Sequence, residues 1–101
     1  MESKTILIVE DEKIIAEDIK NTLIKFNYKI PDIIASGEKA IQKAEEIRPD
    51  LVLMDIMIEG NMNGIEAARR IYRDFEIPIV FLTAYADENI LEQAAESSPF
   101  G

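Results

Sequence analysis

Acidic and hydroxyl side chains directly follow three short apolar runs in this sequence. They are Glu10, Asp11, Asp55 and Thr83. If the runs are parallel strands of one sheet, these side chains collect where the carboxyl ends of the strands meet. Three carboxylates held together repel one another unless a cation neutralises them, and oxygen donors suit a hard ion such as Mg²⁺ better than zinc or copper. The pattern therefore predicts a magnesium site with a hydroxyl beside it.

Each of these residues also has a purely structural interpretation. Asp11 and Glu12 could cap a helix that begins after them and complement its dipole. An Asp at the end of a strand, such as Asp55, is commonly a turn or cap residue, and Thr83 is of a type that is common in strands. The combination of all these residues, rather than any one of them, favours a site.

The composition narrows the chemistry that this site could perform. The 101 residues include no His and no Cys, which excludes an imidazole base, a thiol nucleophile and a zinc site built from either. Eleven Lys and Arg against 20 Asp and Glu leave a formal net charge of −9, which argues against binding of DNA or an anionic membrane by this segment. Because no apolar run approaches the length of a membrane span and no secretory signal is recognisable, we expect a cytoplasmic protein.

Four short apolar runs predict the strands that would position the site. They are Ile6–Val9, Ile33–Ala35, Leu51–Met54 and Ile79–Leu82. Each run is apolar on both faces, which is typical of a parallel sheet that is covered on both sides. The residues between and after the runs have helical spacing, in the stripes Ile14, Ile15, Ile19, Leu23 and Phe26; Ala40, Ile41, Ala44 and Ile47; Ile65, Ala68, Ile71, Tyr72 and Phe75; and Ile90, Leu91, Ala94 and Ala95. Residues 1–101 are thus predicted to form one small doubly wound α/β domain.

Local signals agree with this order of strands and helices. Helix starts are marked by Asp11, Gly37 and Asn63-Gly64, and helix ends by Asn27 and Arg48-Pro49. Pro31 is tolerable at the start of the second strand if that strand lies at an edge of the sheet.

Four sequence blocks together resemble the CheY-like receiver domain of two-component response regulators. The blocks are Ile-Leu-Ile-Val-Glu-Asp-Glu at 6–12, Asp55 after Leu-Val-Leu-Met, Gly60 to Gly64 around Met62-Asn63, and Leu-Thr-Ala at 82–84. They occur in the order of the family, and the match runs from the first predicted strand to the last residue. The resemblance implies a flavodoxin-like sheet with the strand order 2-1-3-4, here without the fifth strand and the fifth helix.

The resemblance also implies a role for each matching residue. Asp55 would accept a phosphoryl group from the phosphohistidine of a histidine kinase or phosphotransfer protein. Glu10 and Asp11 would bind Mg²⁺ together with Asp55, Glu10 largely through water, and Met57 would contribute its backbone carbonyl. Thr83 would bond to the phosphoryl group and couple it to a conformational switch. Such a domain promotes its own phosphorylation and is not otherwise an enzyme.

The end of the sequence departs from the family pattern. Receiver domains continue with a fifth strand, which carries a lysine before a proline, and with a fifth helix, whereas this sequence stops at Ser97–Gly101. None of its lysines matches the missing one, because all of them precede the strand at 51–54. We therefore expect an incomplete fold in which the strand at 79–82 has an exposed edge, to which a second copy of the chain could pair.

Two other functions stay open on the sequence alone. The missing lysine favours a pseudo-receiver, which uses the fold only as a protein-interaction module, whereas the intact acidic residues and Thr83 favour a phosphoacceptor. A nucleotide or flavin binder of the same fold is disfavoured, because the glycines at 37, 60, 64 and 101 form no phosphate-binding motif.

Overall fold

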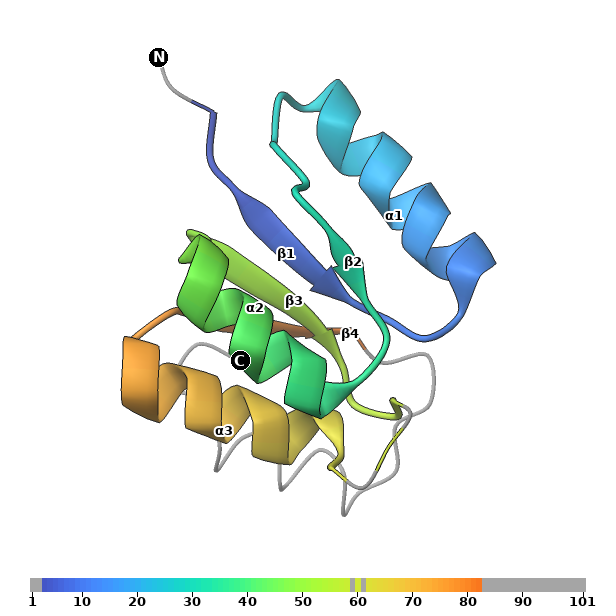
Figure 1. Cartoon of the computed structure of the whole chain (residues 1–101). Helices are drawn as coiled ribbons and strands as arrows, with labels where there is room; N and C mark the ends of the chain where they lie inside the picture. Colours follow the sequence, from blue (N-terminus) through green and yellow to red (C-terminus); the bar gives the residue numbers. More distant parts are fainter. Residues whose placement is uncertain (1–2, 59, 61, 83–101) are drawn as a thin grey trace.

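The predicted strands pair as one parallel sheet (Figure 1). The computed structural model describes residues 3–58, 60 and 62–82. The strands are β1 (Ile6–Val9), β2 (Ile33–Ile34), β3 (Leu51–Asp55) and β4 (Ile79–Leu82), in the order β2-β1-β3-β4. The chain thus moves outward from β1 to β2 and then returns to β3 on the other side of β1. This confirms the predicted strand order, and it makes the carboxyl ends of β1 and β3 neighbours.

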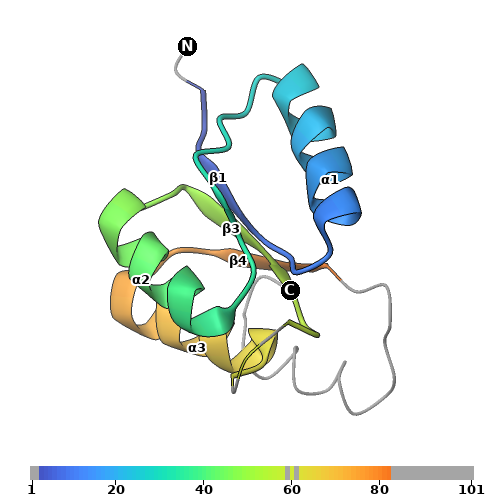
Figure 2. The same ribbon diagram turned by 45° about the vertical axis from the view of Figure 1, so that its right-hand side comes forward.

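The helices in the described residues cover both faces of the sheet. They are α1 (Lys13–Lys25), α2 (Gly37–Ile47) and α3 (Gly64–Phe75). Figures 1 and 2 show α2 and α3 side by side on one face and α1 on the other. The fourth predicted helix, with its stripe from Ile90 to Ala95, lies outside the described residues. None of the helices in the described part of the chain is long and apolar enough to cross a membrane.

The larger core lies between the sheet and the α2–α3 layer. It contains the strand residues Leu7, Val9, Val52, Met54 and Ile79 and the helix residues Ala40, Ala44, Ala67, Ala68 and Ile71. The small alanines let both helices approach the sheet closely, and every residue in this set is 0% exposed. The carboxyl ends of β1 and β3 are thus packed tightly against this core.

The apolar stripe of α1 is buried only in part. Ala16 is fully buried, whereas Ile14 is 86% exposed and Phe26 is 70% exposed. Successive residues of a helix differ by about 100° in direction, so Ile14, two positions before Ala16, projects away from the sheet. Ile14 and Phe26 thus share the helical spacing of the predicted stripe but are not buried against the sheet.

The predicted strand boundaries differ from the structure by one residue at two places. β2 ends at Ile34, one residue before the predicted end at Ala35, and it lies at the sheet edge as Pro31 required. β3 includes Asp55, which was expected to follow the strand. Asp55 pairs in register with Leu82 of β4, and its backbone is therefore held by the sheet itself.

Candidate functional site

The carboxyl ends of β1 and β3 bring three carboxylates together. Glu10 and Asp11 directly follow β1, and Asp55 is the last residue of β3. One carboxylate oxygen from each residue lies within 4.8 Å of the other two. The cluster arises because β1 and β3 pair in parallel, with Val9 opposite Met54. These are the carboxylates that the sequence predicted to meet.

The side chain of Glu12 does not cap α1. Glu12 occupies the N-cap position of α1, but its side chain makes no capping hydrogen bond. Its backbone N–H instead donates to Oε1 of Glu10 at 3.1 Å. By contrast, the N-cap of α3 is Asn63, whose Oδ1 accepts from the N–H of Glu66 at 2.9 Å. The capping interpretation is therefore wrong for Glu12.

Burial and mutual repulsion raise the affinity of the cluster for a proton. Glu10 is only 7% exposed, and its pKa is raised to about 7, first by burial and then by the negative charge of Asp55, while the Glu12 N–H acts in the opposite direction. The pKa of Asp55 is also raised, mainly by burial and further by the charge of Asp11. A bound cation would relieve the same repulsion that the proton relieves.

The donor set fits Mg²⁺. It consists of carboxylate oxygens, which this ion prefers, and Mg²⁺ commonly uses one or two carboxylates and keeps several waters. Among the described residues, the salt bridges lie elsewhere, between Lys43 and Glu46 and between Arg73 and Asp74. No lysine or arginine of the described ranges therefore neutralises the three carboxylates by an ion pair, and this leaves their negative charge available to a metal ion.

Of the other two predicted site residues, Met57 and Thr83, the structure describes only Met57. Met57 lies two residues after Asp55, and its backbone N–H donates to Oδ1 of Asp55 at 3.2 Å. Its side chain is 56% exposed, and the use of its carbonyl as a metal ligand stays a prediction. Thr83 directly follows β4 and lies outside the described residues, as do Ala84 and Tyr85.

The two glycines of the block from Gly60 to Gly64 differ in their structural roles. Gly60 has a φ of 100°, which favours glycine and fits a turn. Gly64 begins α3 and lies against the backbone of Asp55. Sequence reasoning missed this contact; the signal available was a glycine at a helix start that already has a capping residue, Asn63.

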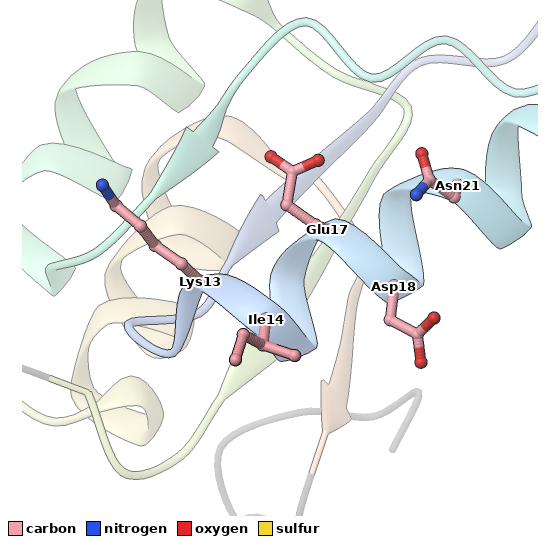
Figure 3. Close-up of a pocket in the computed structure, with 5 residues that line it drawn as sticks. All are labelled: Lys13, Ile14, Glu17, Asp18 and Asn21. Carbon is pink, nitrogen blue, oxygen red and sulfur yellow. The ribbon is translucent and has the colours of Figure 1, made fainter.

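A shallow depression also lies on the outer side of α1. It is lined by Lys13, Ile14, Glu17, Asp18 and Asn21. Figure 3 shows these side chains on a single helix, with Lys13 and Glu17 projecting to one side and Asp18 to the other. Because all of them belong to α1, the depression lacks a facing wall that could enclose a ligand. The carboxylate cluster is the better candidate for a functional site.

Comparison with known proteins decides the family of this chain. The family model of the response regulator receiver domain matches residues 6–100. The chain belongs to this family. The receiver domain is 35% identical over 94 residues to the transcriptional regulatory protein PdtaR of Mycobacterium tuberculosis strain H37Rv, which covers 93% of this chain and 45% of PdtaR. It thus spans less than half the length of that relative.

Solved structures resemble the receiver domain over nearly all of its length. The signal receiver domain of a modulated diguanylate cyclase from Desulfovibrio desulfuricans G20 matches with a TM-score of 0.90 and 31% identity, over 95% of this chain and 76% of that one. The receiver domain of the sensor histidine kinase PA1611 from Pseudomonas aeruginosa PAO1 matches with a TM-score of 0.83 and 29% identity, over 95% of this chain and 80% of that one. The latter structure has a magnesium ion coordinated in its active site cleft.

Proposed function

We propose that this receiver domain, residues 1–101, is the phosphoacceptor of a two-component system. Asp55 takes a phosphoryl group from a partner histidine kinase or phosphotransfer protein in a Mg²⁺-dependent reaction, and the chain then changes conformation to signal. The observation that carries this proposal is the cluster of Asp55 with Glu10 and Asp11, whose oxygens lie within 4.8 Å of one another. Because the chain has no His, the phosphohistidine must come from outside it.

The hydrogen bonds of Asp55 suit a nucleophile. The N–H of Met57 donates to Oδ1, and Oδ2 would attack phosphorus. The new bond joins Oδ2 to phosphorus, the P–N bond of the phosphohistidine breaks, and its electron pair leaves with the imidazole of the partner. Glu10, Asp11 and Asp55 would hold Mg²⁺, which supplies charge neutralisation for the phosphoryl oxygens. Thr83 would donate to the same oxygens from the end of β4.

Two further observations support this proposal. The neighbour from Pseudomonas aeruginosa binds magnesium in its cleft, which favours Mg²⁺ as the ion held by the carboxylates here. The net charge of −9 disfavours nucleic acid and anionic lipid as partners of this segment, so we expect protein partners in the cytoplasm.

A small phosphodonor tests the proposal directly. The chain is incubated with acetyl phosphate and Mg²⁺, and its intact mass is measured by mass spectrometry. We expect the mass of one added phosphoryl group, and we expect no added mass when a chelator is present during the incubation. No added mass, together with no response to a beryllofluoride mimic, would contradict the proposal and favour a pseudo-receiver that acts only through protein contacts.

The edge of β4 suggests a second partner, another copy of this chain. Within residues 3–82 as described, β4 pairs with β3 and no other strand occupies its second edge. Unpaired strand edges of this kind template strand pairing. We therefore expect dimers that form with increasing concentration, measured by size-exclusion chromatography with light scattering. A monomer at every concentration would overturn the pairing of β4 edges.

A further inference from the structure

Glycine is required at position 64 because a side chain would not fit there, and not because the backbone conformation demands glycine. A methyl group on Gly64 would overlap the carbonyl oxygen of Asp55 and would come within 2.9 Å of the Asp55 carbonyl carbon and of Ile56 Cα. These atoms belong to the backbone, so no side chain can rotate away to make room. The φ of Gly64 is not among the positive values that favour glycine. Its missing side chain is therefore what lets α3 approach the end of β3.

Both sides of this contact are held in place. α3 is anchored by Ile65 and Ile71, which are 3% and 0% exposed, and the N–H of Gly64 donates to the carbonyl of Ile56 at 2.9 Å. On the other side, β3 pairs with β1 along one edge and with β4 along the other. A larger residue at 64 must therefore displace either the first turn of α3 or the backbone that carries the Asp55 carboxylate.

We infer that Gly64 is a positioning residue for Asp55, an inference that rests on the proposed function for the identity of the ion and of the reaction. The seating of α3 on the end of β3 sets where the Asp55 carboxylate stands relative to Glu10 and Asp11. Metal ligands must keep their distances within a few tenths of an ångström, and a misplacement of about 1 Å at a reacting group can cost about a hundredfold in rate. Gly64 itself touches neither the ion nor the phosphoryl group.

A matched pair of glycine variants tests this inference. Gly37 also begins a helix and is also buried, but the atoms nearest to a methyl group there are Ala67 Cβ at 3.1 Å and the Met62 carbonyl oxygen at 3.2 Å, rather than the backbone of Asp55. We expect Gly64→Ala to weaken Mg²⁺ binding at least about tenfold and to slow phosphorylation by acetyl phosphate at saturating Mg²⁺ by about tenfold to a hundredfold. Gly37→Ala should change the Mg²⁺ affinity and the phosphorylation rate by no more than about twofold from the wild-type values.

Mg²⁺ affinity is measured by calorimetric titration, and folding of each variant is checked by circular dichroism. A folded Gly64→Ala that binds Mg²⁺ as tightly as the wild type would overturn the inference. If Gly64→Ala does not fold, Ile65→Ala takes its place, because Ile65 packs against Ile56 and anchors the same turn. We then expect Mg²⁺ binding to weaken at least about threefold, and unchanged affinity would again overturn the inference.

The wild-type chain separates failure of this inference from failure of the proposed function. A wild type that accepts a phosphoryl group, beside a folded Gly64→Ala that does so equally well, contradicts only the role of Gly64. A wild type that neither binds Mg²⁺ nor accepts a phosphoryl group contradicts the proposed function, and the positioning role of Gly64 fails with it.

Discussion

Asp55→Asn is expected to abolish phosphorylation of the receiver domain, with a loss of at least about a thousandfold in rate. The amide of Asn nearly matches the carboxylate in size, but it lacks the negative charge and the lone-pair donor strength of a nucleophilic oxygen. The N–H of Met57 can still donate to the amide oxygen as it does to Oδ1. The fold should therefore survive, and the loss of phosphorylation should report chemistry rather than unfolding.

The variant is compared with the wild type after incubation with acetyl phosphate and Mg²⁺, by intact mass and by peptide mapping of the modified residue. Asp18→Asn is the control, because it removes one negative charge from an exposed position on α1 and should leave uptake unchanged. A phosphoryl group that still appears on Asp55→Asn in wild-type yield would contradict the assignment of Asp55 as the acceptor.

The strands could be predicted from the residues because each central strand is buried on both faces, whereas their order was implied by the resemblance to receiver domains. Leu7 and Ile8 of β1 are 0% exposed, and Val52 and Leu53 of β3 are 0% and 9% exposed, so apolar residues fill consecutive positions. Parallel pairing with crossover helices then leaves few arrangements of four strands. The carboxylate cluster could be predicted once β1 and β3 were taken to be neighbours, because Glu10, Asp11 and Asp55 then meet at one end of the sheet.

The contacts that depend on close approach could not be predicted in this way. The stripe on α1 did not reveal which of its apolar residues face the sheet, since the sheet-facing side centres on the small Ala16 rather than on Ile14. The role of Gly64 depends on the distance between α3 and the Asp55 carbonyl, and residue spacing does not encode such a distance. A glycine in a loop and a glycine in a tight helix–strand contact look alike in one sequence.

Glu10→Gln is expected to stabilise the metal-free domain at about pH 8 and to change its stability far less at about pH 5. The pKa of Glu10 is raised to about 7 by burial and by the charge of Asp55, whereas an unfolded chain gives Glu its ordinary value of 4.5. The folded state therefore binds a proton that the unfolded state has lost between these two values. This contribution to stability is complete below about pH 4.5 and is lost as the pH rises through about 7.

Gln is a neutral substitute for the protonated form of Glu10. The variant therefore keeps at pH 8 the contribution to the unfolding free energy that the wild type loses when Glu10 ionises. A raise from 4.5 to about 7 corresponds to a difference in unfolding free energy of up to about 3 kcal/mol. Urea unfolding of both proteins at several pH values, in the presence of a chelator, measures it. Glu12→Gln serves as the control, because Glu12 is an exposed neighbour and its replacement changes the net charge equally.

Addition of Mg²⁺ connects this pH dependence to the site. An ion bound by the carboxylates replaces the proton, so Mg²⁺ should raise the unfolding free energy of the wild type more at about pH 8 than at about pH 5. Glu10→Gln should respond less at pH 8, because it has lost both the repulsion and one of the negative charges that attract the ion. A stability difference between the two proteins that stays constant from pH 5 to pH 8 would show that burial and the charge of Asp55 do not raise the pKa of Glu10 in the folded state, and it would contradict this prediction.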